Sequence, residues 1–163
     1  MILSEEVLIG VAGIAITLIG FSGVVTALGR RDTGLWSPQE ILQLRTLVEP
    51  SIISLFSAVV PVALGIVIVN DEVIWKVANG VVFVANFVGI AAFVRRGSAG
   101  GRHPSHKVGF FISNLIMLAM LAGMFSPLKW TQLTFFLGMN LGIGVSVHNY
   151  YLLLFSARED CGE

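Results

Sequence analysis

The stretch from Val7 to Leu28, VLIGVAGIAITLIGFSGVVTAL, contains no charged residue and is followed at once by Gly29, Arg30 and Arg31. A helix needs about 20 apolar residues to cross the ~30 Å hydrocarbon core of a membrane, because each residue adds about 1.5 Å along its axis. The sequence therefore predicts an all-α integral membrane protein, a single domain that forms a bundle of five transmembrane helices. The five runs lie at about 7–28, 51–69, 73–94, 108–125 and 131–155 of residues 1–163.

The composition argues against a water-soluble domain. Hydrophobic residues make up 55% of the chain and charged residues only 12%, and the mean hydropathy is +0.86. A soluble domain carries about 25% charged residues. The loops between the runs are short and poor in aromatic residues, which does not suit nucleic-acid binding. The expected partners are therefore the lipid bilayer and other transmembrane helices.

The basic residues predict the orientation of the bundle. When the five runs are threaded alternately through a membrane, all ten Lys and Arg residues except Lys76 and Lys129 fall on one side. Short loops rich in Lys and Arg stay in the cytoplasm. We therefore expect the N-terminus outside and the C-terminus in the cytoplasm. The short loops favour the cytoplasmic membrane of a bacterium as the location.

A helix of a different kind is expected at about 38–49. Ser37 and Glu40 have the spacing of a capping box, and the residues that follow are amphipathic at helical period. Pro50 marks a bend into the second run. We expect this amphipathic helix to lie at the inner membrane surface, or to extend the second span into the cytoplasm. The fourth run, 108–125, is borderline in length for a full span.

Small residues predict which helix faces meet. Helices in a membrane associate through close packing and hydrogen bonds, and not through the hydrophobic effect. Glycines share one face of the first run, and a second ridge of small residues lies on the fifth run, with Asn140, Gly144 and His148 on a further face. The fifth helix should therefore be central, with partners on both sides. The expected packing positions are Gly10, Gly13, Gly20, Gly138, Gly142 and Ser146.

Polar side chains inside the runs form the candidate site. Most of them fall at one depth, in the inner half of the membrane. They would make either a hydrogen-bonded belt between helices or a water-filled vestibule open to the cytoplasm. His148 is the one titratable group well inside a run, which makes it a functional candidate. The candidate residues are His148, Asn140, Asn114, Asn86, Ser54 and Ser57.

Signatures of enzymes and of metal sites are missing from the sequence. It contains no HExxH, GxSxG or P-loop motif and no pair of intramembrane aspartates. His103 and His106 have a metal-like spacing, but Pro104 interrupts the register and no carboxylate or thiol is near. We expect no metal, no cofactor and no catalysis. The sequence favours a helix-bundle subunit that forms a homo-oligomer or accompanies a larger membrane complex. The alternative is a small oligomeric transporter or channel with a cytoplasm-facing polar site around His148.

Overall fold

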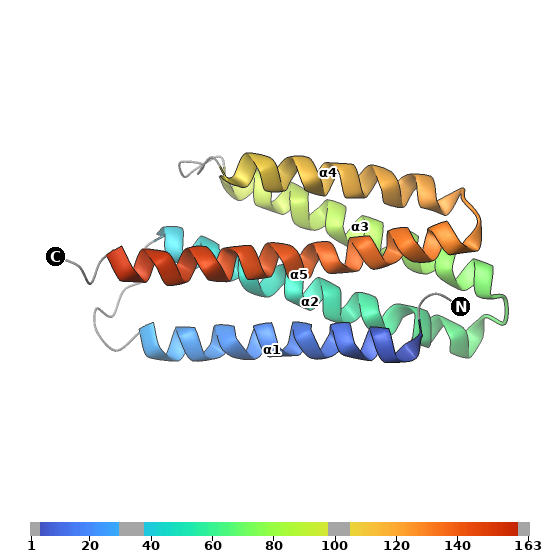
Figure 1. The fold of residues 1–163 in the computed structure, drawn as a ribbon, viewed down its shortest axis with the longest axis horizontal. Helices are drawn as coiled ribbons and strands as arrows, with labels where there is room; N and C mark the ends of the chain where they lie inside the picture. The colour runs from blue at the N-terminus through green and yellow to red at the C-terminus, as the bar shows by residue number, and fades with distance from the viewer. Residues whose placement is uncertain (1–3, 30–37, 98–104, 160–163) are drawn as a thin grey trace.

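The computed structural model describes residues 4–29, 38–97 and 105–159. Every regular element in these residues is a helix, and consecutive helices run antiparallel (Figure 1). The first turn of α1 and the last turn of α5 therefore lie at opposite ends of the bundle. The helices are α1 (Glu5–Gly29), α2 (Pro38–Val67), α3 (Asp71–Gly97), α4 (Ser105–Met124) and α5 (Leu128–Glu159).

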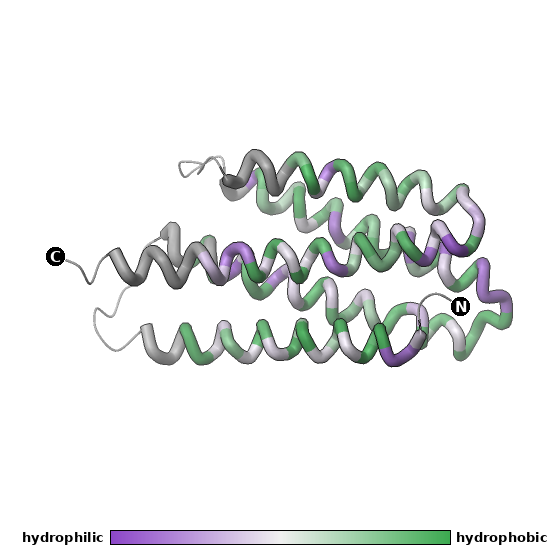
Figure 2. Tube along the Cα trace, viewed as in Figure 1, coloured by the Kyte–Doolittle hydropathy of each residue, from purple (hydrophilic) through white to green (hydrophobic). Residues whose placement is uncertain are grey.

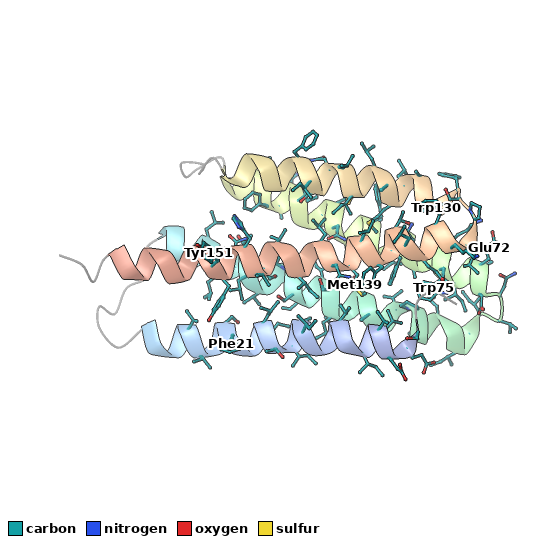
Figure 3. The ribbon with its side chains drawn as sticks, in the orientation of Figure 1. Phe21, Glu72, Trp75, Trp130, Met139 and Tyr151 are labelled. Atoms are coloured by element: carbon teal, nitrogen blue, oxygen red, sulfur yellow. The ribbon has the colours of Figure 1, made fainter. Side chains whose placement is uncertain are left out.

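Three of these helices are long and apolar enough to cross a membrane. The stretches are Glu5–Val25 in α1, Leu44–Val67 in α2 and Asp71–Arg95 in α3, and α4 contributes a shorter apolar stretch, Phe111–Met124. Figure 2 shows apolar residues along most of the length of these helices. Trp130 lies near one end of the bundle and Tyr151 toward the other (Figure 3), as aromatic residues do at the two interfaces of a membrane. These features indicate a membrane location.

The amphipathic segment at 38–49 does not form a separate helix. It is the first part of α2, which continues through Pro50 and Pro61 as one helix. Of the two expected arrangements, the structure has the one in which this segment extends the second run. Leu47 is buried, and Ser51 Oγ lies 2.9 Å from the Ser146 hydroxyl of α5. Contacts on both sides of Pro50 thus hold α2 against the bundle and offset a cost of about 3 kcal/mol for a proline inside a helix.

The capping residue Ser37 lies outside the described residues, but the start of α3 is well defined. Asn70 Oδ1 accepts hydrogen bonds from the backbone N–H groups of Glu72, at 3.0 Å, and Val73, at 3.3 Å. An asparagine in this position satisfies N–H groups that have no partner inside the helix. Lys76 Nζ pairs with Glu72 Oε1 at 2.7 Å one turn further on. The turn between α2 and α3 is therefore fixed by local polar contacts.

The fifth helix is central, but only one of its two predicted faces, that of Gly138, Gly142 and Ser146, is buried. α5 contacts each of the other four helices, whereas α1 contacts only α2 and α5 in the described part of the chain. Phe135 and Met139 of α5 are fully buried in the core, and the ring of Phe135 meets that of Trp75 edge-on, with centroids 5.3 Å apart. The face that carries Gly144 and His148 is exposed, so the expectation of partners on both sides of α5 is not met within one copy.

Candidate functional site

Two glycines on one face of α5 allow α2 and α4 each to approach the α5 backbone closely. Gly142 lies against Ser54 and the backbone of Pro50 in α2, and Gly138 lies against the Met120 side chain of α4. A Cβ atom at position 142 would be 2.6 Å from the Pro50 carbonyl oxygen, far inside van der Waals contact. The obstacle at Gly138 is a flexible side chain, but at Gly142 it is backbone. In the α2–α5 contact, glycine is therefore required at position 142, because any larger residue would overlap the backbone of α2.

Hydroxyl groups join α2 to α5 on the same face. Ser54 Oγ donates to the Met139 carbonyl at 2.7 Å, and the hydroxyls of Ser51 and Ser146 are 2.9 Å apart. Ser51 Oγ also lies 2.9 Å from the Leu47 carbonyl of its own helix. Because a hydroxyl has one proton, both contacts are satisfied when Ser146 donates to Ser51 and Ser51 donates to Leu47. All three serines are buried.

Two further side chains join α5 to α3 and α4. Asn86 Nδ2 in α3 donates to the Gly138 carbonyl of α5 at 3.2 Å and to the Val82 carbonyl of its own helix at 3.0 Å. Thr131 Oγ1 in α5 donates to the Gly123 carbonyl of α4 at 2.8 Å. A buried hydrogen bond between membrane helices contributes about 0.6–2 kcal/mol. Together with the serines, these groups form a belt of hydrogen bonds that links α5 to three neighbours. The belt extends along α5 from Thr131 to Ser146, about 22 Å at about 1.5 Å per residue, and does not lie at the single depth that the sequence predicts.

Asn79 is a fully buried member of this belt with an incomplete set of partners. Its Nδ2 donates to the Met120 carbonyl at 2.9 Å and lies 3.4 Å from Thr134 Oγ1. Its Oδ1 has no hydrogen-bond partner among the described residues. A buried acceptor without a partner costs about 1–3 kcal/mol. Asn79 therefore joins α3 to α4 at a net gain smaller than that of Asn86.

The structure separates the six predicted site residues. Three of them are buried: Ser54 and Asn86 bond to the α5 backbone, and Ser57 donates to the Ile53 carbonyl of its own helix at 2.6 Å. Asn140 is half-buried and donates to Phe136 O on its own helix at 2.8 Å.

The remaining two lie at the surface of the bundle. Asn114 is exposed on α4, where it lines a groove against α3, and His148 is exposed on α5. The six residues therefore divide into those that bond to another helix, those that bond within their own helix and those at the surface. Of the six, only Asn114 lines either of the two grooves described below. Ser54 and Asn86 join helices through hydrogen bonds, and the cytoplasm-facing vestibule stays a prediction.

Some members of the belt are missing from the sequence-based set of site residues. Ser51 and Thr131 each bond to another helix. Ser51 lies three residues before Ser54 on the same helical face, and this spacing was a usable signal. Thr131 is the first residue of the fifth apolar run. The sequence does not indicate that the Gly123 carbonyl of α4 lies within reach of its hydroxyl.

The small residues of α1 do not pack inside the chain. A Cβ atom added to Gly10, Gly13 or Gly20 meets nothing within 4 Å in the described part of the chain. The reason is that α1 packs on the bundle through a different stripe, in which Leu8 and Ala15 are buried. The expected packing role of these three glycines is therefore not found within one copy, whereas Gly138, Gly142 and Ser146 do pack.

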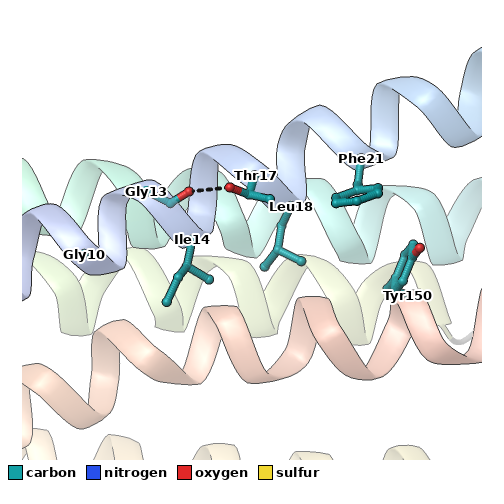
Figure 4. A pocket seen from close by; sticks show the side chains of 7 residues that line it. All are labelled: Gly10, Gly13, Ile14, Thr17, Leu18, Phe21 and Tyr150. Atoms are coloured by element: carbon teal, nitrogen blue, oxygen red, sulfur yellow. Dashed lines mark hydrogen bonds between the residues drawn. The ribbon is translucent and has the colours of Figure 1, made fainter.

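The glycine face of α1 instead borders an open groove against α5 (Figure 4). The groove has a volume of about 540 Å³. Thr17 Oγ1 donates to the Gly13 carbonyl at 2.8 Å, so its hydroxyl is already satisfied within α1. The ring of Phe21 meets that of Tyr150 at the end of the groove, with centroids 6.1 Å apart. We call the face formed by Gly10, Gly13, Thr17 and Gly20 the glycine face.

Comparison with protein-family models, with curated proteins and with solved structures found no match to this chain. Among the described residues, no group of three or more His, Cys, Asp or Glu side chains is placed to hold a metal ion. The fold defines the class of protein: an all-helical bundle in which three helices are long and apolar enough to cross a membrane.

Proposed function

We propose that this chain is a non-enzymatic membrane subunit that associates with a second copy of itself through the glycine face of α1. In this proposal all five helices cross the membrane, with the N-terminus outside and the C-terminus in the cytoplasm. The observation that carries it is the open space beside Gly10, Gly13 and Gly20, on a helix that packs against the bundle through one stripe that includes Leu8 and Ala15.

Glycine inside a helix is unfavourable unless something uses it. It costs about 1 kcal/mol relative to alanine, because the unfolded backbone has more freedom to lose. At Gly142 the cost is offset by close contact with α2, but at Gly10, Gly13 and Gly20 no contact with the described residues offsets it. Membrane helices with small residues on one face associate by letting their backbones approach. A second helix against the glycine face would supply the missing contact.

A second copy of the chain is the simplest partner of this shape. Two identical faces can meet across a twofold axis, as in most homodimers. α1 is also accessible to a partner, because α1 contacts neither α3 nor α4 among the described residues. The same face would accept a helix of a larger membrane complex, and identifying the proteins that co-purify distinguishes the two cases.

The test is the mass of the complex in mild detergent. The Gly13→Leu variant is expected to be a folded monomer where the natural chain is a dimer, because a Cβ at this position meets nothing within 4 Å in the described chain and the leucine fills the glycine face. Gly23→Leu is the matched control: Gly23 is also open but does not line the groove. A monomeric natural chain, or equal masses for the two variants, would refute the proposal.

A further inference from the structure

A second groove lies between α3 and α4, away from the glycine face. Its volume is about 430 Å³. Phe83 and Phe87 of α3 form one wall, with parallel rings whose centroids are 6.5 Å apart, and Leu118 and Leu121 of α4 line the groove opposite them. Phe87 is 60% exposed and Leu118 65% exposed, so neither is covered by another part of the described chain.

The groove includes one basic side chain. Arg95 lines it and is the last residue of the apolar stretch Asp71–Arg95, so its guanidinium lies where a membrane would meet water. Asn114 is the other polar lining residue, and no acidic side chain is among the described residues that line the groove. At about 1.5 Å per residue, the wall from Phe83 to Arg95 is about 18 Å long. One leaflet of the hydrocarbon core is about 15 Å deep.

We propose that this groove binds one anionic phospholipid, with an acyl chain along Phe87 and Leu118 and the phosphate at Arg95. The lining is complementary to such a lipid, with a basic side chain for the anionic phosphate and apolar side chains for an acyl chain. An arginine can hold phosphate oxygens through two parallel N–H donors. Basic positions between helices on the cytoplasmic side are typical sites for anionic headgroups.

A lipid suits this groove better than another helix does. The walls are phenylalanine and leucine side chains, which keep a neighbouring backbone at a distance, whereas close helix association needs small residues. A flexible acyl chain can follow such a surface. The proposal depends on the membrane location of the bundle but not on its self-association, so either can fail without the other.

The experiment uses the full chain, delipidated in mild detergent and mixed with phosphatidylglycerol or with phosphatidylcholine of the same acyl chains. Native mass spectra then give the occupancy of each lipid. We expect one phosphatidylglycerol to be retained in preference to phosphatidylcholine. Arg95→Gln should lower that preference about fivefold, the effect of one basic residue near a membrane surface. Arg45→Gln, an exposed arginine outside the groove, should leave it unchanged.

A second variant keeps the test decisive if Arg95→Gln does not fold. Leu118→Trp fills the groove from an exposed position and should lower the occupancy of both lipids. Equal retention of the two lipids by the natural chain would overturn the headgroup assignment. Equal effects of Arg95→Gln and Arg45→Gln would show only diffuse attraction to basic residues. Unchanged occupancy in Leu118→Trp would overturn the position of the site.

Discussion

Gly142 of α5 lies so close to Pro50 of α2 that a Cβ atom on Gly142 would be 2.6 Å from the Pro50 carbonyl oxygen. This contact sits beside the hydrogen bond from Ser54 to the Met139 carbonyl. Close approach and side-chain hydrogen bonding therefore act at the same place, and they fix α2 against the central helix. The stability of the bundle should depend on this contact more than on any polar group at its surface.

Replacing Gly142 by alanine should destabilise the bundle. The added methyl group overlaps the Pro50 backbone, which cannot move without shifting α2, and overpacking of this kind costs about 1–3 kcal/mol. Gly144→Ala is the matched control, since a Cβ at Gly144 meets nothing within 4 Å in the described chain. Thermal unfolding in detergent should show a lower midpoint for Gly142→Ala only. Equal midpoints for the two variants would mean that the helices are further apart than described.

The two serines of α2 should differ in their effect on stability. Ser54 donates to another helix, whereas Ser57 donates to Ile53 of its own helix. Ser54→Ala should lower the free energy of unfolding by about 0.6–2 kcal/mol, and Ser57→Ala should change it by less. Both side chains are buried, so burial does not explain a difference. A larger loss for Ser57→Ala in the same unfolding assay would contradict the belt.

The two buried asparagines of α3 should also differ. Asn79→Leu removes a hydrogen bond and an unsatisfied Oδ1 together, so its two effects partly cancel. Asn86→Leu removes a donor to Gly138 without removing such a penalty. The loss of stability should be larger for Asn86→Leu by about 1 kcal/mol. Unfolding midpoints of the two variants provide the comparison, and a larger loss for Asn79→Leu would show that its Oδ1 has a partner in the membrane.

His148→Phe separates the subunit proposal from the transporter alternative. Because His148 is exposed on α5, the substitution should leave the unfolding midpoint unchanged, and self-association through α1 should be unaffected. If the protein is a transporter with its site at His148, the folded variant should lose transport. Reconstituted vesicles that lose an ion or substrate flux in this variant alone would favour the alternative.

Much of the fold was predictable from local patterns. Uninterrupted apolar runs indicate the helices, and the ridge of Gly138, Gly142 and Ser146 indicates that α5 is central, whereas the face of Gly144 and His148 is exposed. The path of α2 was harder to predict. Pro50 separates the amphipathic segment from the second apolar run in the sequence, but both belong to one helix, and Leu47 and Ser51 are buried on either side of Pro50.

The candidate site was less predictable than the fold. Periodicity gives the depth and the face of a residue, but not which neighbour covers that face. Gly10 and Gly142 therefore give the same signal in sequence, although one faces open space and the other a backbone carbonyl. His148 likewise has the right depth for a buried site, yet lies on an exposed face.

The measurement that tests the central claim most directly is disulfide cross-linking in native membranes. With Cys161 replaced by serine, Gly13→Cys places one thiol on the glycine face, and Gly23→Cys places one on α1 outside the groove. If two copies meet through the glycine face, mild oxidation converts the Gly13→Cys chain into a covalent dimer and leaves the Gly23→Cys chain monomeric. Cross-linking that is absent at Gly13→Cys, or equal at the two positions, would contradict this arrangement.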